Sequence, residues 1–184
     1  MPLNASSFLI LGMVRNGVNS GYAIRRTIEN MRMEAFWATT FAQIYPHLAD
    51  LEHEGYLVRH DDPQGARPRS AYTLSRKGEE ALDAWLRSTD LPPIEVRDEG
   101  LLRLGFSDNL SPEETLALLG RLRERSEAAE REFREYNLPM AAGAAEQGYR
   151  AALMIARMGA EYHAWAAAWF GQLESELQRE LESS

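Results

Sequence analysis

The stretch TTFAQIYPHLADLEHEGYL, residues 39–57, decides the fold of this chain. Its large apolar side chains recur at spacings of three, four and three residues, which predicts one face of an amphipathic helix. They are Phe41, Ile44, Leu48 and Leu51. Pro46 stands inside this pattern, although a proline in a helix interior costs about 3 kcal/mol. Gly55 comes after the pattern and suits a left-handed cap, so we expect the helix to end there.

Two shorter helical patterns come before this stretch, and two strand-like runs come after it. The earlier helices are expected at residues 4–14, with Asn4 or Ser6 as the cap, and at residues 20–31. The runs YLVRH and SAYTL are rich in β-forming residues, and the nine-residue basic loop between them contains Gly65 and two prolines, which predicts a hairpin. A fourth helix follows, with Ser75 as its cap. The order of three helices, strand, basic loop and strand is that of a winged helix-turn-helix.

The proline-marked stretch TDLPPIEVRD, residues 89–98, separates this module from the rest of the chain. We therefore expect two domains, at residues 1–90 and 91–184, in a mostly α protein. Ser111, Pro112 and Glu114 mark the start of a long helix that is expected to stop at Asn137-Leu138-Pro139. Another is expected over about residues 144–181, and its heptad-like spacing of large side chains suggests a coiled-coil-like dimerisation domain.

Composition narrows the class of protein. The chain of 184 residues is 45% hydrophobic, which is enough for a packed core, and its lack of cysteine fits a reducing compartment. Neither a signal peptide nor an apolar run long enough for a membrane span is visible, so we expect a cytoplasmic protein without a membrane partner. The net charge of −8 is uneven: residues 1–90 carry ten Lys+Arg against eleven Asp+Glu, and the acidic excess lies in residues 91–184. A basic face on the first domain is therefore compatible with the acidic whole.

In a winged helix-turn-helix, the third helix enters the major groove and the hairpin loop reaches the DNA backbone. Hydrogen-bonding side chains on the outer face of the helix can approach base edges, and arginines on the hairpin gain from counterion release. The alternative interpretation is that these polar side chains are ordinary solvated helix and loop residues without a role in DNA binding. We interpret Pro46 as distorting the first helical turn and so setting how that turn meets the duplex. The predicted DNA-binding residues are Thr39, Thr40, Gln43, Tyr45, His47, Arg67, Arg69 and Lys77.

Three stretches resemble the PadR-like family of transcriptional regulators. SGYAI, FAQIYPHLADLEHEGYL and RSAYTLSRKGEEAL are similar to the second helix, the recognition helix and the wing-to-helix segment of that family. LPPIEVRDEGLLRLGF and the helices after it are similar to the larger C-terminal domain of its longer branch. The sharpest match is a Tyr-Pro pair with Leu, Leu, Glu and Gly at fixed spacings, found here at Tyr45, Pro46, Leu48, Leu51, Glu54 and Gly55. The resemblance implies a homodimeric repressor that binds an inverted repeat in double-stranded DNA. It also implies that the C-terminal helices form the dimer and often an effector site.

Large side chains on the last helix recur at spacings of three and four residues. One interpretation is a dimer core, because tryptophans at helical spacing usually pack against a partner helix. The other is a pocket for a flat, small aromatic effector, which would use stacking and the polar edges of Trp and Tyr. His163, on the same helix, is interpreted as a packing or solvated residue. The residues of this seam are Ile155, Met158, Tyr162, Trp165 and Trp169.

Catalytic motifs are missing from the sequence. His53-Glu54 is not followed by a histidine at metalloprotease spacing, and the chain has neither a phosphate-cradling glycine loop nor a nucleophile elbow. We expect no enzyme activity, no cofactor and no metal. The expected function is a DNA-binding transcriptional regulator, a homodimeric repressor of a near-palindromic operator, released by a small-molecule effector. The alternative is a winged-helix protein-interaction module in an acidic helical assembly without specific DNA binding.

Overall fold

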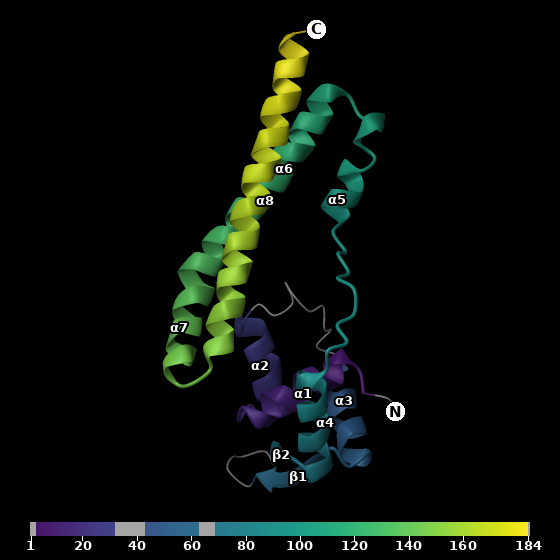
Figure 1. Cartoon of the computed structure of the whole chain (residues 1–184), viewed down its shortest axis with the longest axis vertical. Helices are drawn as coiled ribbons and strands as arrows, with labels where there is room; N and C mark the ends of the chain where they lie inside the picture. The colour runs from purple at the N-terminus through teal and green to yellow at the C-terminus, as the bar shows by residue number, and fades with distance from the viewer. Residues whose placement is uncertain (1–2, 32–42, 63–68, 184) are drawn as a thin grey trace. The chain divides into compact units, whose positions relative to one another are not determined.

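The computed structural model describes residues 3–31, 43–62 and 69–183. It divides the chain into two compact units, Met1–Pro93 and Ile94–Ser184 (Figure 1). Helices dominate both units, and the described residues form one two-stranded sheet. The predicted class, a mostly α protein with an N-terminal winged helix-turn-helix and a helical C-terminal part, is confirmed. No helix in the described ranges is long and apolar enough to cross a membrane.

The N-terminal unit follows the predicted order of elements. Strands β1 and β2 pair antiparallel, from Leu57 opposite Leu74 to Asp62 opposite Arg69. Asn4 caps the first helix by accepting a hydrogen bond from the Ser7 backbone N–H at 2.9 Å, as one of the two predicted caps. The elements are α1 (Ala5–Arg15), α2 (Gly21–Met31), α3 (Ile44–His53), β1 (Leu57–Asp62), β2 (Arg69–Leu74) and α4 (Arg76–Arg87).

The core of this unit forms where α3 meets the other helices and the hairpin. The apolar stripe of α3 is fully covered: Ile44, Leu48 and Leu51 are at most 2% exposed. They pack in one cluster with residues of α1, α2, β1, β2 and α4. Burying each such side chain contributes about 1.5–3 kcal/mol. The rotation of α3 about its own axis is therefore set, and so is the face that it leaves outward.

Helix α3 ends as the sequence predicts. Gly55 has φ of 76°, a left-handed conformation that glycine adopts without steric cost. Its N–H donates to the Glu52 carbonyl at 3.0 Å, and the Tyr56 N–H donates to the Leu51 carbonyl at 2.8 Å. These two hydrogen bonds satisfy carbonyls that the helix leaves open at its C-terminus.

The position of Pro46 differs from the expectation. The described helix begins at Ile44, so Pro46 is its third residue and lies in the first turn. Backbone N–H groups of the first turn have no partner inside a helix, so a proline there removes no helical hydrogen bond. The cost of an interior proline therefore does not apply. Ala42 lies four residues before Pro46, so its carbonyl is the group that an interior proline would leave without a hydrogen bond, and it lies outside the described residues.

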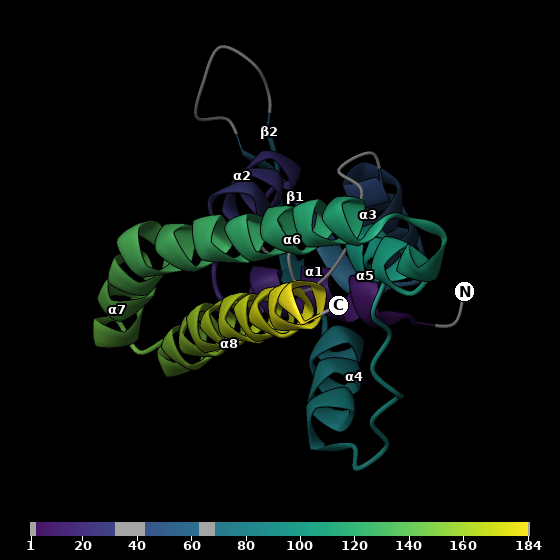
Figure 2. The same ribbon diagram turned by 90° about the horizontal axis from the view of Figure 1, so that it is seen from above.

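The C-terminal unit is built on two long helices. α6 begins with the predicted capping box, in which Ser111 and Glu114 satisfy each other's backbone N–H groups. α8 is 33 residues, about 50 Å at 1.5 Å per residue. Figures 1 and 2 both show it lying alongside α6, where a shared cluster includes Leu118, Leu122 and Phe170. The elements are α5 (Glu99–Leu104), a 3-10 turn (Ser107–Asn109), α6 (Pro112–Glu132), a π-helical turn (Phe133–Asn137), α7 (Leu138–Glu146) and α8 (Arg150–Glu182).

The expected helix boundary at Asn137-Leu138-Pro139 is wrong. α6 passes through the π-helical turn directly into α7, and the chain reverses only at Gly148, whose φ is 101°. In the π-helical turn the Leu138 N–H donates to the Phe133 carbonyl, five residues earlier. Pro139, just after this wider turn, stands in the first turn of α7. A proline is tolerated in that place, so the pattern that predicted a stop marks a change of helical pitch instead.

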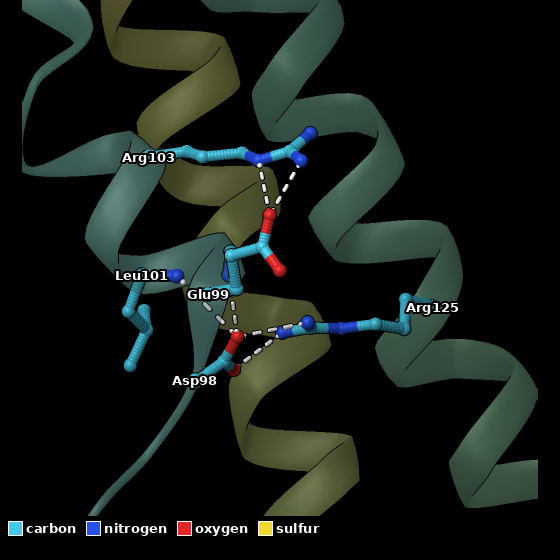
Figure 3. A network of polar contacts seen from close by, with 6 residues as sticks. Asp98, Glu99, Leu101, Arg103 and Arg125 are labelled. Atoms are coloured by element: carbon cyan, nitrogen blue, oxygen red, sulfur yellow. Dashed lines mark hydrogen bonds and ion pairs between the residues drawn. The ribbon is translucent and has the colours of Figure 1, made fainter.

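Helix α5 has only six residues and is held against α6 by side chains (Figure 3). Asp98 caps α5 by accepting hydrogen bonds from the backbone N–H groups of Gly100 and Leu101, at 2.7 and 3.4 Å. The same carboxylate accepts two hydrogen bonds from Arg125 of α6, at 2.9 and 2.6 Å. So short a helix is unstable alone, and these contacts fix its position. The hydrogen bond from Arg125 is the main reason why the pKa of Asp98 lies below its ordinary value.

The packing of α4 against the chain at Tyr56, just before β1, can be tested by a substitution at Gly78. A Cβ atom at this position would overlap the Tyr56 carbonyl oxygen, which is fixed by a hydrogen bond from the Ser75 N–H at 3.0 Å. Gly78→Ala should lower the free energy of unfolding by about 1–3 kcal/mol in chemical denaturation. Gly12→Ala is the control, because nothing lies within 4 Å of its added methyl, and it should stabilise by about 0.5–1 kcal/mol. Equal effects of the two substitutions would contradict this packing.

The Asp98–Arg125 pair predicts a pH dependence of stability. A carboxyl whose pKa is lowered on folding contributes stability above its unfolded pKa, and the contribution is lost as the pH falls through the folded pKa. Asp98→Asn keeps a capping side chain but loses the charge, so it should destabilise the protein by about 1 kcal/mol at pH 7. The difference from the wild type should shrink below about pH 4, measured by thermal unfolding across pH. A difference that stays constant down to pH 2 would mean that the charge of Asp98 contributes nothing.

Candidate functional site

The first turn of α3 presents its polar side chains away from the core. Gln43 precedes the helix, is exposed, and makes no capping hydrogen bond to it. Tyr45 is 57% exposed and Pro46 is exposed, while Ile44 between them is buried. The backbone N–H groups of this turn and the positive end of the helix dipole favour an anion such as phosphate. The turn thus combines a hydrogen-bonding amide, an exposed phenol and a helix N-terminus on one surface.

Tyr45 is held by the start of α2. A Cβ atom at Gly21 would lie 2.6 Å from the Cε1 atom of the tyrosine ring, so only glycine admits the ring in this position. The ring therefore lies over the backbone of α2, where the neighbouring Arg25 forms an ion pair with Glu29 at 2.9 Å. That hydrogen bond raises the pKa of the Arg25 guanidinium, which stays charged. The close contact between α2 and α3 is what orients Tyr45.

His47 differs from the expectation of a freely exposed side chain. The residue is half-buried, and within the described ranges its Nδ1 atom is buried with no hydrogen-bond partner. It lies one residue before Leu48, which is 1% exposed, and so stands at the margin of the core. A ring placed there has a packing role in addition to any role at the surface.

Lys77 lies at the opposite end of α3 from Gln43. Its Nζ atom donates a hydrogen bond to the Glu54 carbonyl at 2.6 Å and stands 4.0 Å above the centre of the Tyr56 ring. A cation at a helix C-terminus satisfies an open carbonyl and complements the helix dipole. Lys77 therefore stabilises the end of α3, and its contact with DNA stays a prediction.

Part of the predicted interface lies outside the described residues. Thr39, Thr40 and Arg67 fall there. Arg69 is the first residue of β2 and pairs in register with Asp62, so the hairpin that carries the basic loop is present.

The predicted seam of α8 is exposed along its whole length. Its five side chains are between 37% and 59% exposed, far more than large apolar residues in a covered core. Neighbouring aromatic rings contact each other: the ring centres of Trp165 and Trp169 are 6.1 Å apart, and those of Tyr162 and Trp165 are 6.2 Å apart. Its members are Ile155, Met158, Tyr162, Trp165 and Trp169. A continuous apolar face of this kind marks a surface for binding.

A cavity of about 300 Å³ opens along one edge of the seam, and three seam residues line it; its volume is within the size range of small-molecule sites. The aromatic rings of α8 form much of its wall, and the Asp98–Arg125 pair lines it as well. Burial is the main cause that lowers the pKa of His163, and the positive charge of Arg125 adds to it, so this imidazole is neutral at pH 7. The lining residues are Asp98, Leu101, Arg125, Ser126, Tyr162, His163, Trp165, Ala166, Trp169 and Phe170.

The periodicity of the sequence predicts that Tyr162, Trp165 and Trp169 lie together, but it gives no sign of the polar groups beside them. Asp98 caps α5 and Arg125 lies in α6, 27 residues further along the chain, so no local pattern connects them. His163 is predicted to be a packing or solvated residue; its ring contacts Phe133, with centres 5.6 Å apart, and also lines the cavity. No group of three His, Asp or Glu side chains among the residues described is placed to hold a metal ion.

Comparisons with known proteins agree with this arrangement. Residues 10–84 match the model of the Transcriptional regulator PadR-like family. The negative transcriptional regulator PadR of Bacillus subtilis is 34% identical over 108 residues, which are 58% of this chain and 59% of that protein. The matched part thus spans less than two thirds of this curated relative.

Solved structures extend the likeness to almost the whole chain. PadR of Bacillus subtilis in complex with operator DNA superposes with a TM-score of 0.82 at 25% identity, covering 96% of this chain and 99% of that one. The same regulator in complex with p-coumaric acid gives a TM-score of 0.74 at 22% identity, over 95% and 99% of the two chains. The resemblance predicted from the sequence is confirmed: this protein carries a domain of the PadR-like family of transcriptional regulators, within a fold that such regulators share along nearly its entire length.

Proposed function

We propose that this protein is a DNA-binding transcriptional regulator that acts as a homodimeric repressor of a near-palindromic operator. Residues 1–90 form the DNA-binding domain, and residues 91–184 form the dimerisation and effector domain. The single observation that carries the proposal is the likeness, at a TM-score of 0.82 and over 96% of the chain, to a PadR that was crystallised with its operator DNA. Such a regulator works where the DNA is, in the cytoplasm, and its family is one of regulators rather than enzymes.

The first turn of α3 is the proposed reader of DNA sequence. Gln43 can form a pair of hydrogen bonds with a base edge, and Tyr45, held over Gly21, can donate its hydroxyl to a phosphate. Thr39, Thr40 and His47 are proposed to complete this surface. Arg67 and Arg69 of the hairpin are proposed to bind the backbone, where positive charge releases counterions whatever the sequence.

The exposed seam of α8 is the proposed dimer interface. Its side chains recur at heptad-like spacings, which suits a partner helix of the same kind, and two copies would bury apolar surface that one copy leaves in water. A two-fold dimer would place two α3 helices about 34–36 Å apart, in successive major grooves. An inverted repeat in the operator mirrors this symmetry.

A small aromatic effector is proposed to bind the cavity beside the seam. The walls carry stackable rings, and a structural relative of this protein binds p-coumaric acid. An effector that prefers one dimer geometry over the other shifts the spacing of the α3 helices and releases the DNA.

Salt dependence separates DNA binding from the alternative, in which the winged helix is a protein-interaction module in an acidic assembly. The wild type should bind duplex DNA at low salt, and the affinity should fall steeply as salt rises, because each neutralised phosphate releases counterions. Electrophoretic mobility shifts across a salt series measure this. If the protein does not bind duplex DNA at low salt, or if its affinity for DNA does not change with salt concentration, the repressor proposal is wrong.

Two substitutions separate sequence reading from backbone binding. Arg67→Ala should weaken binding to all duplexes about equally and reduce the salt slope by about 1. Gln43→Ala should cost about 1–3 kcal/mol on the preferred sequence and less on others, because a base contact discriminates. Competition between duplexes that differ at single positions gives the comparison. Equal loss across sequences for Gln43→Ala would remove this residue from the base readers.

The dimer interface is tested at Met158, which is 54% exposed and belongs to the seam. Met158→Glu should convert the dimer to monomer in sedimentation experiments, because a charge buried without a partner at the interface costs several kcal/mol. Ala168→Glu adds the same charge at an exposed position of α8 outside the seam and should leave the dimer intact. Dissociation by both variants, or by neither, would count against the seam as the interface.

A further inference from the structure

We propose that the carboxylate of Asp98 competes with the carboxylate of an aromatic effector for Arg125, so that binding of the effector frees the start of α5 and the linker before it. This inference rests on the proposed effector site and adds the residue pair through which that site would control the DNA-binding domain. Asp98 then occupies, in the ligand-free protein, the place that the anionic group of the ligand takes in the complex.

The geometry of the pair supports this competition. Arg125 donates from Nη1 to Oδ1 of Asp98 at 2.9 Å and from Nη2 to Oδ2 at 2.6 Å, a two-pronged contact that a ligand carboxylate can reproduce (Figure 3). The Arg125 side chain is 51% exposed and the Asp98 side chain 24%, so the guanidinium is accessible to a ligand. Both residues line the same cavity as Trp165 and Trp169.

The charges around the cavity favour an anionic ligand. To bind Arg125, this ligand has to displace the carboxylate of Asp98. Arg125 is the one cation among the described residues that line it, and His163 is kept neutral by burial and by Arg125 itself. As long as Asp98 holds Arg125, the pair has no net charge and offers little attraction to a second carboxylate. A flat ring stacks on the aromatic wall, and its carboxylate gains the guanidinium only when Asp98 leaves it.

Asp98 also stands where the cavity meets the connection to the N-terminal unit. It follows residues 88–97, which have neither helix nor strand and which contain the boundary between the two compact units. It begins α5, whose six residues depend on contacts with α6. Displacing its carboxylate from Arg125 removes the ion pair that fixes the end of the linker. The cost of that opening lowers the affinity for the ligand, and by linkage the ligand favours the opened state.

Asp98→Asn is the decisive variant, since it keeps a capping side chain and removes the competing charge. We expect p-coumaric acid to bind it about tenfold more tightly than it binds the wild type, by titration of tryptophan fluorescence, while the neutral amide of the same compound binds both equally. The control is Glu99→Gln, which removes an adjacent carboxylate that pairs with Arg103, away from Arg125 (Figure 3). That variant should bind the acid as the wild type does. Unchanged affinity of the acid for Asp98→Asn would overturn the inference.

A second readout does not depend on the ligand. Because Asp98→Asn resembles the opened state, its affinity for the duplex DNA that the wild type binds should fall several-fold without any acid, while Glu99→Gln stays unchanged. If Asp98→Asn fails to fold, Arg125→Gln replaces it and should lose about tenfold in affinity for the acid but not for the amide.

The outcomes separate this inference from the function on which it rests. A wild type that binds DNA and releases it on adding the acid, with Asp98→Asn indistinguishable from it, overturns the competition alone. A wild type that binds DNA but not the acid overturns the inference and the effector proposal, and leaves the DNA-binding proposal standing. A wild type that binds no DNA overturns the proposed function itself.

Discussion

Burial of one side of α3 is the constraint on which the N-terminal unit depends. Ile44, Leu48 and Leu51 are almost fully covered, so the helix cannot rotate about its axis without exposing apolar surface at a cost of several kcal/mol. The outward direction of Gln43 and Tyr45 is the other consequence of the same packing. At one end, the close contact of Tyr45 with Gly21 sets the side chain, and at the other, Gly55 and Lys77 satisfy the last carbonyls. The surface available for recognition is thus held by the core beneath it.

In the C-terminal unit, two sides of the long helix α8 have different roles. One side of α8 packs on α6, with Phe170 in the shared cluster and Glu174 bound to Arg123 at 2.6 Å. Another side carries the exposed seam, and the cavity lies beside it, with the Asp98–Arg125 pair in its lining. A dimer surface and a ligand site on the same helix would be coupled by geometry alone, because any shift of α8 against α6 changes both.

Most of the local structure could be predicted from the sequence, because it depends on interactions between residues that are close together in the chain. Capping residues, glycine at a left-handed position and apolar periodicity report on neighbours within a few residues, and Asn4, Ser75, Gly55 and the Ser111–Glu114 box were found in this way. The failures have the same origin. The helix was expected to stop at Pro139 because a local rule cannot foresee a π-helical turn that accommodates this proline, and Pro46 was expected to carry the cost of an interior proline although it stands in the first turn of the described helix.

By itself, therefore, the sequence determined most of the elements, their order and the resemblance to PadR-like regulators, since each rests on residue types at fixed local spacings. Only the tertiary structure decided which side chains meet across the chain: Tyr45 over Gly21, Lys77 at the end of α3, and Asp98 on Arg125 beside the tryptophans of α8. Those contacts join residues from different elements, brought together by burial of apolar surface that each helix shares with its neighbours. The spacing of apolar residues predicts that a helix has an apolar face, but only the packed structure determines which residues that face contacts.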